Sequence, residues 1–327
     1  MAEVPLLKVS ELVKEFPLAG GLLARPHARV RAVNGVSFAI SRGETFALVG
    51  ESGCGKTTLG RLILGLIKPS GGDIEFDGQN FQSLSANQMR RLRRRMQIIF
   101  QDPYSSLDPR MKVDTIVTEP LCAIKRLPKN QRRIVAAELL EKVGMQPVDL
   151  DKYPHEFSGG QRQRIGIARA LCVQPELIVA DEPVSALDVS IQAQIINLMQ
   201  DLKHEFNLSY VFISHDLSVV EHVSDRIAVM YLGTIVELAP TEKFRVSPRH
   251  PYTAALLRAV PMPDPHCKTE PLPIAGDVPS PIDPPSGCAF HPRCPHAFDR
   301  CQAEQPPLIE ATSQHFVACW LNEGRGL

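Results

Sequence analysis

The sequence predicts an α/β fold in which helices cover both faces of a parallel sheet. Three short apolar runs, Thr45–Val49, Leu177–Ala180 and Tyr210–Ile213, have the length and composition of buried strands. Segments with helical spacing lie between and after them, at 57–66 and 191–205. This alternation is typical of parallel sheets, because parallel neighbours need a crossover connection. The length of 327 residues allows one large domain or two modest ones.

The chain before the first buried strand is predicted to form strands of its own. Residues 1–40 contain short apolar stretches separated by a loop at 20–31 that is rich in glycine, proline and arginine. The stretch Val30–Ile40 has the β-branched content of strands. Its Asn34-Gly35 pair predicts a tight turn.

Between the first two buried strands the pattern adds a further strand and a helical region. Residues 83–95 are polar and helix-prone, and Gln97–Phe100 has the pattern of a strand. Most of 110–175 is helical in pattern. After the last buried strand, Ile227–Leu238 predicts a hairpin about Tyr231-Leu232-Gly233.

Charge and hydropathy exclude several function classes. The formal net charge is zero, with 36 basic and 36 acidic residues, so the chain lacks the general basic field that favours nucleic acid. The arginine-rich run Arg90–Arg95 could touch nucleic acid or anionic lipid, but a solvated helix face is the favoured interpretation. No window holds the roughly 18 uninterrupted apolar residues that a membrane span needs. Charges within Met1–Lys14 do not fit a secretory signal, which predicts an intracellular chain whose link to a membrane runs through a partner.

A glycine-rich loop with one lysine lies between the strand 45–49 and the helix after it. It fits G-x-x-x-x-G-K-[ST] without a mismatch. Glycines let backbone N–H groups turn toward an anion, and the helix adds its positive N-terminal end. Lys56 supplies a charge for the β- and γ-phosphates of ATP, and Thr57 offers a hydroxyl to Mg²⁺. The predicted ATP-binding residues are Gly50, Glu51, Ser52, Gly53, Cys54, Gly55, Lys56, Thr57 and Thr58.

Two adjacent carboxylates follow the second buried strand. Asp181 and Glu182 come at its C-terminal end, where parallel sheets place their ligands. We expect Asp181 to hold Mg²⁺ through its water shell and Glu182 to orient or deprotonate the attacking water. A solvated acidic pair is the alternative, and the phosphate loop in the same sheet disfavours it.

The segment Ser158-Gly159-Gly160-Gln161-Arg162 resembles the signature of the ATP-binding cassette (ABC) family, with Phe157 where leucine is commoner. A serine and two glycines before a helix suit a γ-phosphate, and they also form an ordinary helix N-cap. The resemblance implies that Ser158, Gly159, Gly160 and Gln161 act on the ATP held by the opposite subunit.

Other motifs follow in the family's order. Gln101 matches the Q-loop, which senses Mg²⁺ and contacts the membrane subunit, and Asp188 closes a D-loop, Ser185-Ala186-Leu187-Asp188. His215 matches the switch histidine at the γ-phosphate, and Phe16 matches the aromatic residue that stacks on adenine. The resemblance thus implies Glu182, His215 and Gln101 as catalytic residues and Thr57, Gln101 and Asp181 as residues around Mg²⁺.

The implied fold is a P-loop NTPase ABC cassette. It would have a RecA-like parallel-sheet core, an N-terminal antiparallel β subdomain and a helical signature subdomain. We place the ATP-binding domain at 5–258, with its helical subdomain at about 102–175. Dense prolines between Pro261 and Pro285 mark the boundary to a small Cys/Pro-rich C-terminal extension, 259–327.

Local features resemble the ATPase subunits of dipeptide and oligopeptide importers, of the F type. They include His250-Pro251-Tyr252-Thr253 and Pro284-Pro285-Ser286-Gly287-Cys288. Such a subunit pairs with a second, homologous ATPase subunit as a heterodimer, with two integral-membrane permease subunits and with an extracytoplasmic substrate-binding protein. The resemblance implies a peripheral place at the cytoplasmic face of the bacterial inner membrane, and no nucleic-acid partner.

Four cysteines of the extension have a spacing that allows a metal site. They follow C-x5-C-x6-C-x17-C and are Cys288, Cys294, Cys301 and Cys319. Four thiolates could hold a [4Fe–4S] cluster, and four reduced cysteines that pack a small core are an equal alternative; Zn²⁺ stands behind both, because the gaps are wider than the usual zinc C-x2-C pair. Cys267 lies outside this spacing and has no assigned role.

The sequence therefore predicts an ATPase that energises peptide uptake, with alternatives open. A soluble ABC ATPase of DNA repair or translation is disfavoured, because no coiled-coil insertion, zinc module or duplicated cassette is seen. A non-hydrolysing regulatory module is disfavoured because Lys56, Asp181, Glu182 and His215 are all present. The cargo stays open, since importers of nickel or glutathione share such subunits, and so does the activity of the second ATP site.

Overall fold

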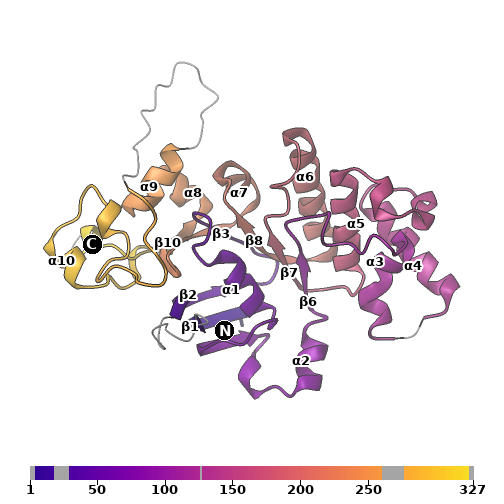
Figure 1. Cartoon of the computed structure of the whole chain (residues 1–327), viewed down its shortest axis with the longest axis horizontal. Coiled ribbons are helices and arrows are strands. Elements are labelled where there is room, and N and C mark those ends of the chain that lie inside the picture. The colour runs from indigo at the N-terminus through magenta and orange to yellow at the C-terminus, as the bar shows by residue number, and fades with distance from the viewer. Residues whose placement is uncertain (1–3, 18–28, 126, 260–275, 324–327) are drawn as a thin grey trace, which may run out of the picture. The chain divides into compact units, whose positions relative to one another are not determined.

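The computed structural model describes residues 4–17, 29–125, 127–259 and 276–323 (Figure 1). These residues form two compact units. The described residues of the first unit lie in 4–40, 46–82 and 214–323, and those of the second lie in 41–45 and 83–213. Cys267 and the prolines between 261 and 273 lie outside the described residues.

The first unit contains an antiparallel sheet of four strands in the order β2-β1-β4-β5. The strands are β1 (Leu7–Pro17), β2 (Arg29–Ile40), β4 (Gly71–Phe76) and β5 (Gln79–Asn80). Each neighbouring pair is antiparallel, which gives the N-terminal antiparallel part that the sequence predicts.

The predicted turn at Asn34-Gly35 is wrong, because β2 runs through it. Leu12 of β1 lies opposite Val36 while Lys14 lies opposite Val33, so β2 carries one extra residue there. Gly35 has φ = 67°, a left-handed conformation that glycine adopts without strain. The Asn-Gly pair forms a β-bulge, because the long partner β1 keeps the strand paired on both sides of it.

A mixed sheet forms the second layer of strands in the first unit. In it β3 (Thr45–Val49) is parallel to β9 (Arg226–Tyr231), and β9 is antiparallel to β10 (Thr234–Pro240). The β9–β10 connection confirms the predicted hairpin, with Leu232 and Gly233 at positive φ. The extension adds β11 (Ile309–Thr312) and β12 (His315–Val317), since β12 pairs with β10 and β11 with β12.

Short helices complete the first unit. They are α1 (Lys56–Ile63), α7 (Leu217–Val223), α8 (Thr241–Val246), α9 (Pro251–Arg258) and α10 (Asp299–Ala303), with 3₁₀ turns at His291–Arg293 and Trp320–Asn322.

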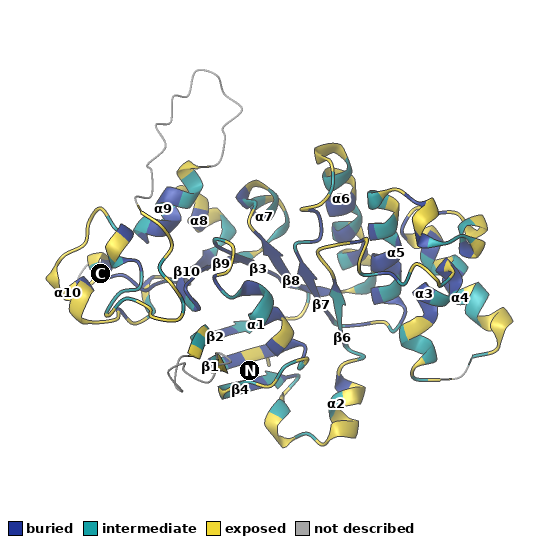
Figure 2. Cartoon of the chain, in the orientation of Figure 1, coloured by how far each residue is buried: buried dark blue, intermediate teal, exposed yellow. Residues whose placement is uncertain are grey.

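The second unit holds three parallel strands and most of the long helices. The strands are β6 (Met96–Ile99), β7 (Leu177–Asp181) and β8 (Ser209–Ser214), in the order β6-β7-β8. Figure 2 shows β7 and β8 as buried along their length, as their continuous apolar runs predict. The helices are α2 (Ala86–Leu92), α3 (Val113–Cys122), α4 (Lys129–Lys142), α5 (Gly159–Leu171) and α6 (Val189–Phe206), with 3₁₀ turns at Pro147–Asp151 and Pro154–Glu156.

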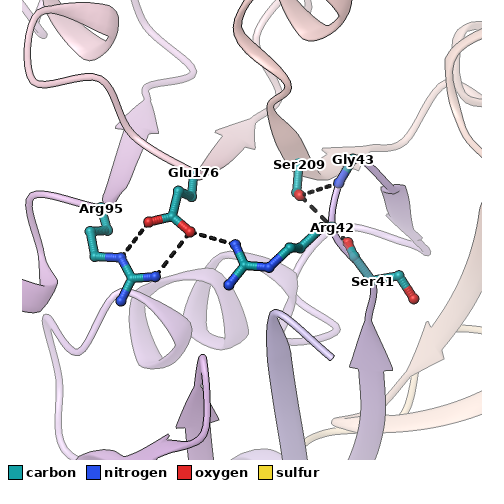
Figure 3. Close-up of polar contacts among 6 residues, drawn as sticks. All are labelled: Ser41, Arg42, Gly43, Arg95, Glu176 and Ser209. Carbon is teal, nitrogen blue, oxygen red and sulfur yellow. Dashed lines mark hydrogen bonds and ion pairs between the residues drawn. The ribbon is translucent and has the colours of Figure 1, made fainter. Parts of the chain in front are cut away.

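Residues 41–45, which lead into β3, are held by polar contacts in the second unit (Figure 3). Glu176 accepts hydrogen bonds from Arg42 (2.6 Å) and from both ends of the Arg95 fork. Ser209 accepts from the Gly43 N–H (2.8 Å). Arg95 of the basic run thus has a structural role, while Arg90, Arg91 and Arg93 are exposed, which agrees with a solvated helix face.

No helix in the described part of the chain is both long enough and apolar enough to cross a membrane.

Candidate nucleotide site

The glycine-rich loop lies between β3 and α1, the context that a phosphate-binding loop requires. Gly50 and Gly55 have φ of 149° and 109°. A Cβ at Gly50 would lie 2.2 Å from the Met230 carbonyl oxygen, and one at Gly55 would lie 2.1 Å from that of Ala32. Neighbouring strands therefore exclude any side chain at these two positions, which fixes the path of the loop.

Lys56 is buried at the start of α1 and folds back over the loop. Its Nζ donates to the carbonyl oxygens of Gly50 (2.8 Å) and Glu51 (2.9 Å) and lies 3.7 Å from the Cys54 Sγ. Burial raises the pKa of Cys54, although Lys56 opposes the shift. Cys54 is therefore a neutral thiol that packs inside the loop.

Phe16 is the last residue but one of β1 and is 39% exposed. The Lys14 Nζ lies 5.0 Å from the ring centroid. This exposure disfavours a core role for Phe16 and is compatible with stacking on adenine. The adenine contact stays a prediction.

Asp181 and Glu182 stand at the C-terminal end of β7, as predicted. Glu182 adopts φ = 48°, and its N–H donates to the Ile213 carbonyl oxygen of β8 (2.9 Å). The Gln101 Nε2 donates to the Glu182 Oε2 (2.9 Å). The structure thus brings together two residues that lie 81 positions apart, of which Glu182 is predicted to act on the attacking water and Gln101 to sense Mg²⁺.

The signature segment forms the N-terminus of α5. Ser158 caps this helix through a reciprocal pair: its Oγ accepts from the Gln161 N–H (3.4 Å), and the Gln161 Oε1 accepts from the Ser158 N–H (3.0 Å). Phe157 is buried, so it fills a core position as leucine would. A Cβ at Gly160 would lie 2.5 Å from Ile191 of α6, so glycine lets α5 and α6 approach closely.

Asp188 lies just before α6, and His215 lies just after β8. Asp188 is exposed at the N-cap position of α6, and its side chain makes no capping hydrogen bond. His215 comes directly after β8 and is also exposed, while the next residue, Asp216, caps α7. Both are placed where a ligand or a second subunit can reach them, and their roles stay predictions.

The four cysteines of the extension line one small pocket, together with His291, His296 and Trp320. All four thiols are free. Burial raises the pKa of Cys288 and Cys294, and that of Cys319 to about 11. Among the described residues, no three Cys, His, Asp or Glu side chains lie close enough together to hold a single metal ion.

Two family descriptions match the chain. "ABC transporter" matches residues 33–185, and "Oligopeptide/dipeptide transporter, C-terminal region" matches residues 236–301. A probable peptide ABC transporter ATP-binding protein, y4tS of Sinorhizobium fredii, is 54% identical over 96% of this chain and 89% of its own length. The oligopeptide transport ATP-binding protein AppF of Bacillus subtilis is 51% identical, over 97% of each chain.

The chain belongs to the ATP-binding proteins of the oligopeptide/dipeptide ABC transporter family. It is thus an ABC ATPase, as the sequence motifs predict.

Solved structures confirm the ABC cassette fold. The cassette MJ0796, in a dimeric post-hydrolysis state bound to ADP and Pi, superposes with a TM-score of 0.64 at 28% identity; the match covers 72% of this chain and 98% of that one. CbiO1 from Clostridium perfringens gives a TM-score of 0.63 at 29% identity, over 74% of this chain and 90% of its own. None of these relatives is named as an iron–sulfur protein.

Sequence reasoning missed two residues of this ABC ATPase that contact the phosphate loop. The Tyr252 hydroxyl accepts from the Glu51 N–H (3.0 Å), and Arg293 forms an ion pair with the Glu51 carboxylate (2.8 Å). In the sequence, Tyr252 indicates only the family resemblance, and Arg293 belongs to no motif. No signal in the sequence shows a contact between residues 242 positions apart.

Proposed function

We propose that this chain is the ATP-hydrolysing subunit of an importer that takes up dipeptides or oligopeptides. The observation that carries the proposal is the match to the peptide-type C-terminal region, residues 236–301, beyond the part that matches ABC transporters in general. The relatives AppF and the dipeptide transport ATP-binding protein DppF of Haemophilus influenzae, 50% identical, bear names of peptide transport.

In the proposed mechanism the phosphate loop holds the triphosphate. The glycine-shaped backbone and Lys56 would bind the β- and γ-phosphates, and Thr57 and Asp181 would hold Mg²⁺, which supplies charge neutralisation at the phosphates. Glu182 accepts the proton of the attacking water. The Gln101 Nε2 lies 2.9 Å from the Glu182 Oε2 and keeps that carboxylate in place, and Gln101 would also sense the metal ion.

The proposal includes a composite site made by two subunits. Ser158, Gly159 and Gly160 lie at an α-helix N-terminus, a position that favours phosphate. They would complete the ATP site of a second, homologous ATPase subunit, with Asp188 and His215 at the same junction. Two permease subunits and an extracytoplasmic binding protein would complete an importer in which this chain lies at the cytoplasmic face of the membrane.

The role of Glu182 is tested by Glu182→Gln, which keeps the shape of the side chain and removes the base. We expect ATPase turnover to fall by roughly 10²- to 10⁴-fold, the usual contribution of a general base. ATP affinity should stay within about twofold, because the substitution leaves the phosphate loop intact. Both are measured on the complex with its partner subunits.

The matched control is Glu138→Gln, on an exposed position of α4. It should leave turnover and affinity unchanged. Wild-type turnover in the Glu182→Gln variant would show that another group activates the water.

We also propose that Cys288, Cys294, Cys301 and Cys319 hold a [4Fe–4S] cluster. The observation that supports this proposal is that the four thiols line one pocket, as the four thiolate ligands of such a cluster must. The raised pKa values mean that loading must displace thiol protons.

The cluster is tested on protein purified without oxygen. We expect about four iron atoms per chain and visible absorbance, both lost in Cys294→Ser but kept in Cys122→Ser, a cysteine of α3. Iron and absorbance near zero in the anaerobic wild type would refute the cluster, and about one zinc per chain would favour the zinc alternative.

A further inference from the structure

Glu51 of the phosphate loop is held at three groups: its N–H, its carbonyl oxygen and its carboxylate. Its N–H donates to the Tyr252 hydroxyl (3.0 Å), and its carbonyl oxygen accepts from the Lys56 Nζ (2.9 Å). Its carboxylate accepts two hydrogen bonds from the Arg293 guanidinium, at 2.8 Å and 3.1 Å. Two of the three partners come from beyond residue 250, at the C-terminal end of the chain.

Arg293 is buried, so its ion pair with Glu51 is not a solvent-exposed surface pair. Its side chain is 7% exposed, against 26% for Glu51. Its guanidinium also donates to the Tyr231 hydroxyl (3.4 Å). Tyr231, Tyr252 and Phe290 pack against one another with ring centroids 4.8 to 5.4 Å apart, and the Arg293 guanidinium carbon lies 5.9 Å from the Tyr231 ring centroid. A planar fork held this way fixes the direction of the carboxylate that it binds.

The charge of Glu51 explains why such a partner is needed. A carboxylate in a loop that binds phosphates repels them, because like charges at short range disfavour each other. Arg293 supplies the compensating positive charge within hydrogen-bond distance. It also keeps the carboxylate turned to one defined partner, so the loop backbone remains available to the anion.

The turn that carries Arg293 is itself tied to the cysteine pocket. The N–H of His291 donates to the Cys288 carbonyl oxygen (2.9 Å), the N–H of Arg293 donates to that of Phe290 (3.0 Å), and Cys294 follows Arg293 directly. The extension therefore reaches the phosphate loop through one residue that the cysteine-bearing segment holds in place.

We propose that Arg293 is a positioning residue of the ATP site, which neutralises and orients Glu51 so that the phosphate loop binds nucleotide. The proposal rests on the proposed function insofar as residues 50–57 hold the triphosphate. In this role Arg293 makes the C-terminal extension part of the nucleotide site.

The test is a double-mutant cycle on the full chain, read as ATP affinity with a fluorescent ATP analogue. Arg293→Met should weaken binding roughly 5- to 30-fold, the usual size of a coupling between sites, because it leaves an uncompensated carboxylate beside the phosphates. Glu51→Gln alone should weaken binding less than Arg293→Met does, because it removes the carboxylate and keeps the backbone contacts of residue 51. The pair Glu51→Gln with Arg293→Met should restore most of the loss. Arg293→Lys, which keeps the charge without the fork, should lie between wild type and Arg293→Met.

Rescue by the second substitution separates positioning from a structural role. If Arg293 made only a structural contact, the double variant would bind ATP as weakly as Arg293→Met does. That result would overturn the proposal. Wild-type affinity in Arg293→Met would overturn it as well. Arg300→Met, an exposed arginine of α10 with partners inside the extension, is the matched control and should bind ATP as the wild type does.

Two further variants keep the result interpretable. If Arg293→Met does not fold, Arg293→Lys, alone and combined with Glu51→Gln, reports the coupling instead. Lys56→Ala should abolish binding whether or not Arg293 matters; normal binding there would refute the phosphate site itself and not the role of Arg293.

Discussion

Glu182 shows at the residue scale how a strained backbone accompanies a predicted functional role. Its φ of 48° is unusual for a residue with a side chain and costs about 1 kcal/mol. The conformation persists because its N–H bonds to Ile213 and its carbonyl oxygen accepts from Ser185. The carboxylate is thereby turned toward Gln101. The sequence predicts the identity of this residue, but its strain depends on the neighbouring strand.

His250 yields a pH prediction at the same scale. Its ring is 1% exposed, and its Nδ1 accepts from the Tyr252 N–H (3.1 Å) at the start of α9. Burial lowers the pKa of His250 from 6.5 to about 4. Below pH 6.5 the unfolded chain binds a proton that the folded chain refuses, so the free energy of unfolding falls as pH drops from about 6.5 to 4. This residue contributes about 3 kcal/mol of that loss.

The measurement is urea unfolding at pH 7.5 and pH 4.5 for wild type and His250→Asn. Asparagine keeps a cap acceptor without a titrating ring, so the loss of stability between the two pH values should be smaller. His204→Asn, an exposed histidine of α6, should behave as the wild type does. Equal losses in wild type and His250→Asn would contradict the assigned pKa.

At the scale of elements, the sequence predicts what short-range pattern determines. The buried strands β7 and β8 and the β9–β10 hairpin were predicted from apolar runs and turn residues, because burial on both faces leaves a continuous pattern. The turn predicted at Asn34-Gly35 was wrong, because this residue pair suits either a turn or a β-bulge. Which of the two forms depends on the register of β2 with β1. Strands β11 and β12 were missed because they have only four and three residues and because β12 is paired with β10, about 80 positions away.

At the scale of the whole molecule, the motifs of the site were predictable because each is local. The phosphate loop, the acidic pair and the signature are each short runs whose residue types follow from phosphate chemistry. The ion pair between Glu51 and Arg293 was not predictable, because the two residues lie 242 positions apart and only the folded structure brings them together. The family match reaches the same extension that makes this contact.

The most direct test of the account is uptake of a labelled dipeptide by cells that lack this chain and are complemented with it. Wild type should restore ATP-dependent uptake and Glu182→Gln should not, although both assemble with their partners; labelled nickel and glutathione, supplied in parallel, should not be taken up. Uptake of nickel or glutathione alone would reassign the cargo, and dipeptide uptake with Glu182→Gln equal to wild type would contradict the claim that hydrolysis by this chain drives import.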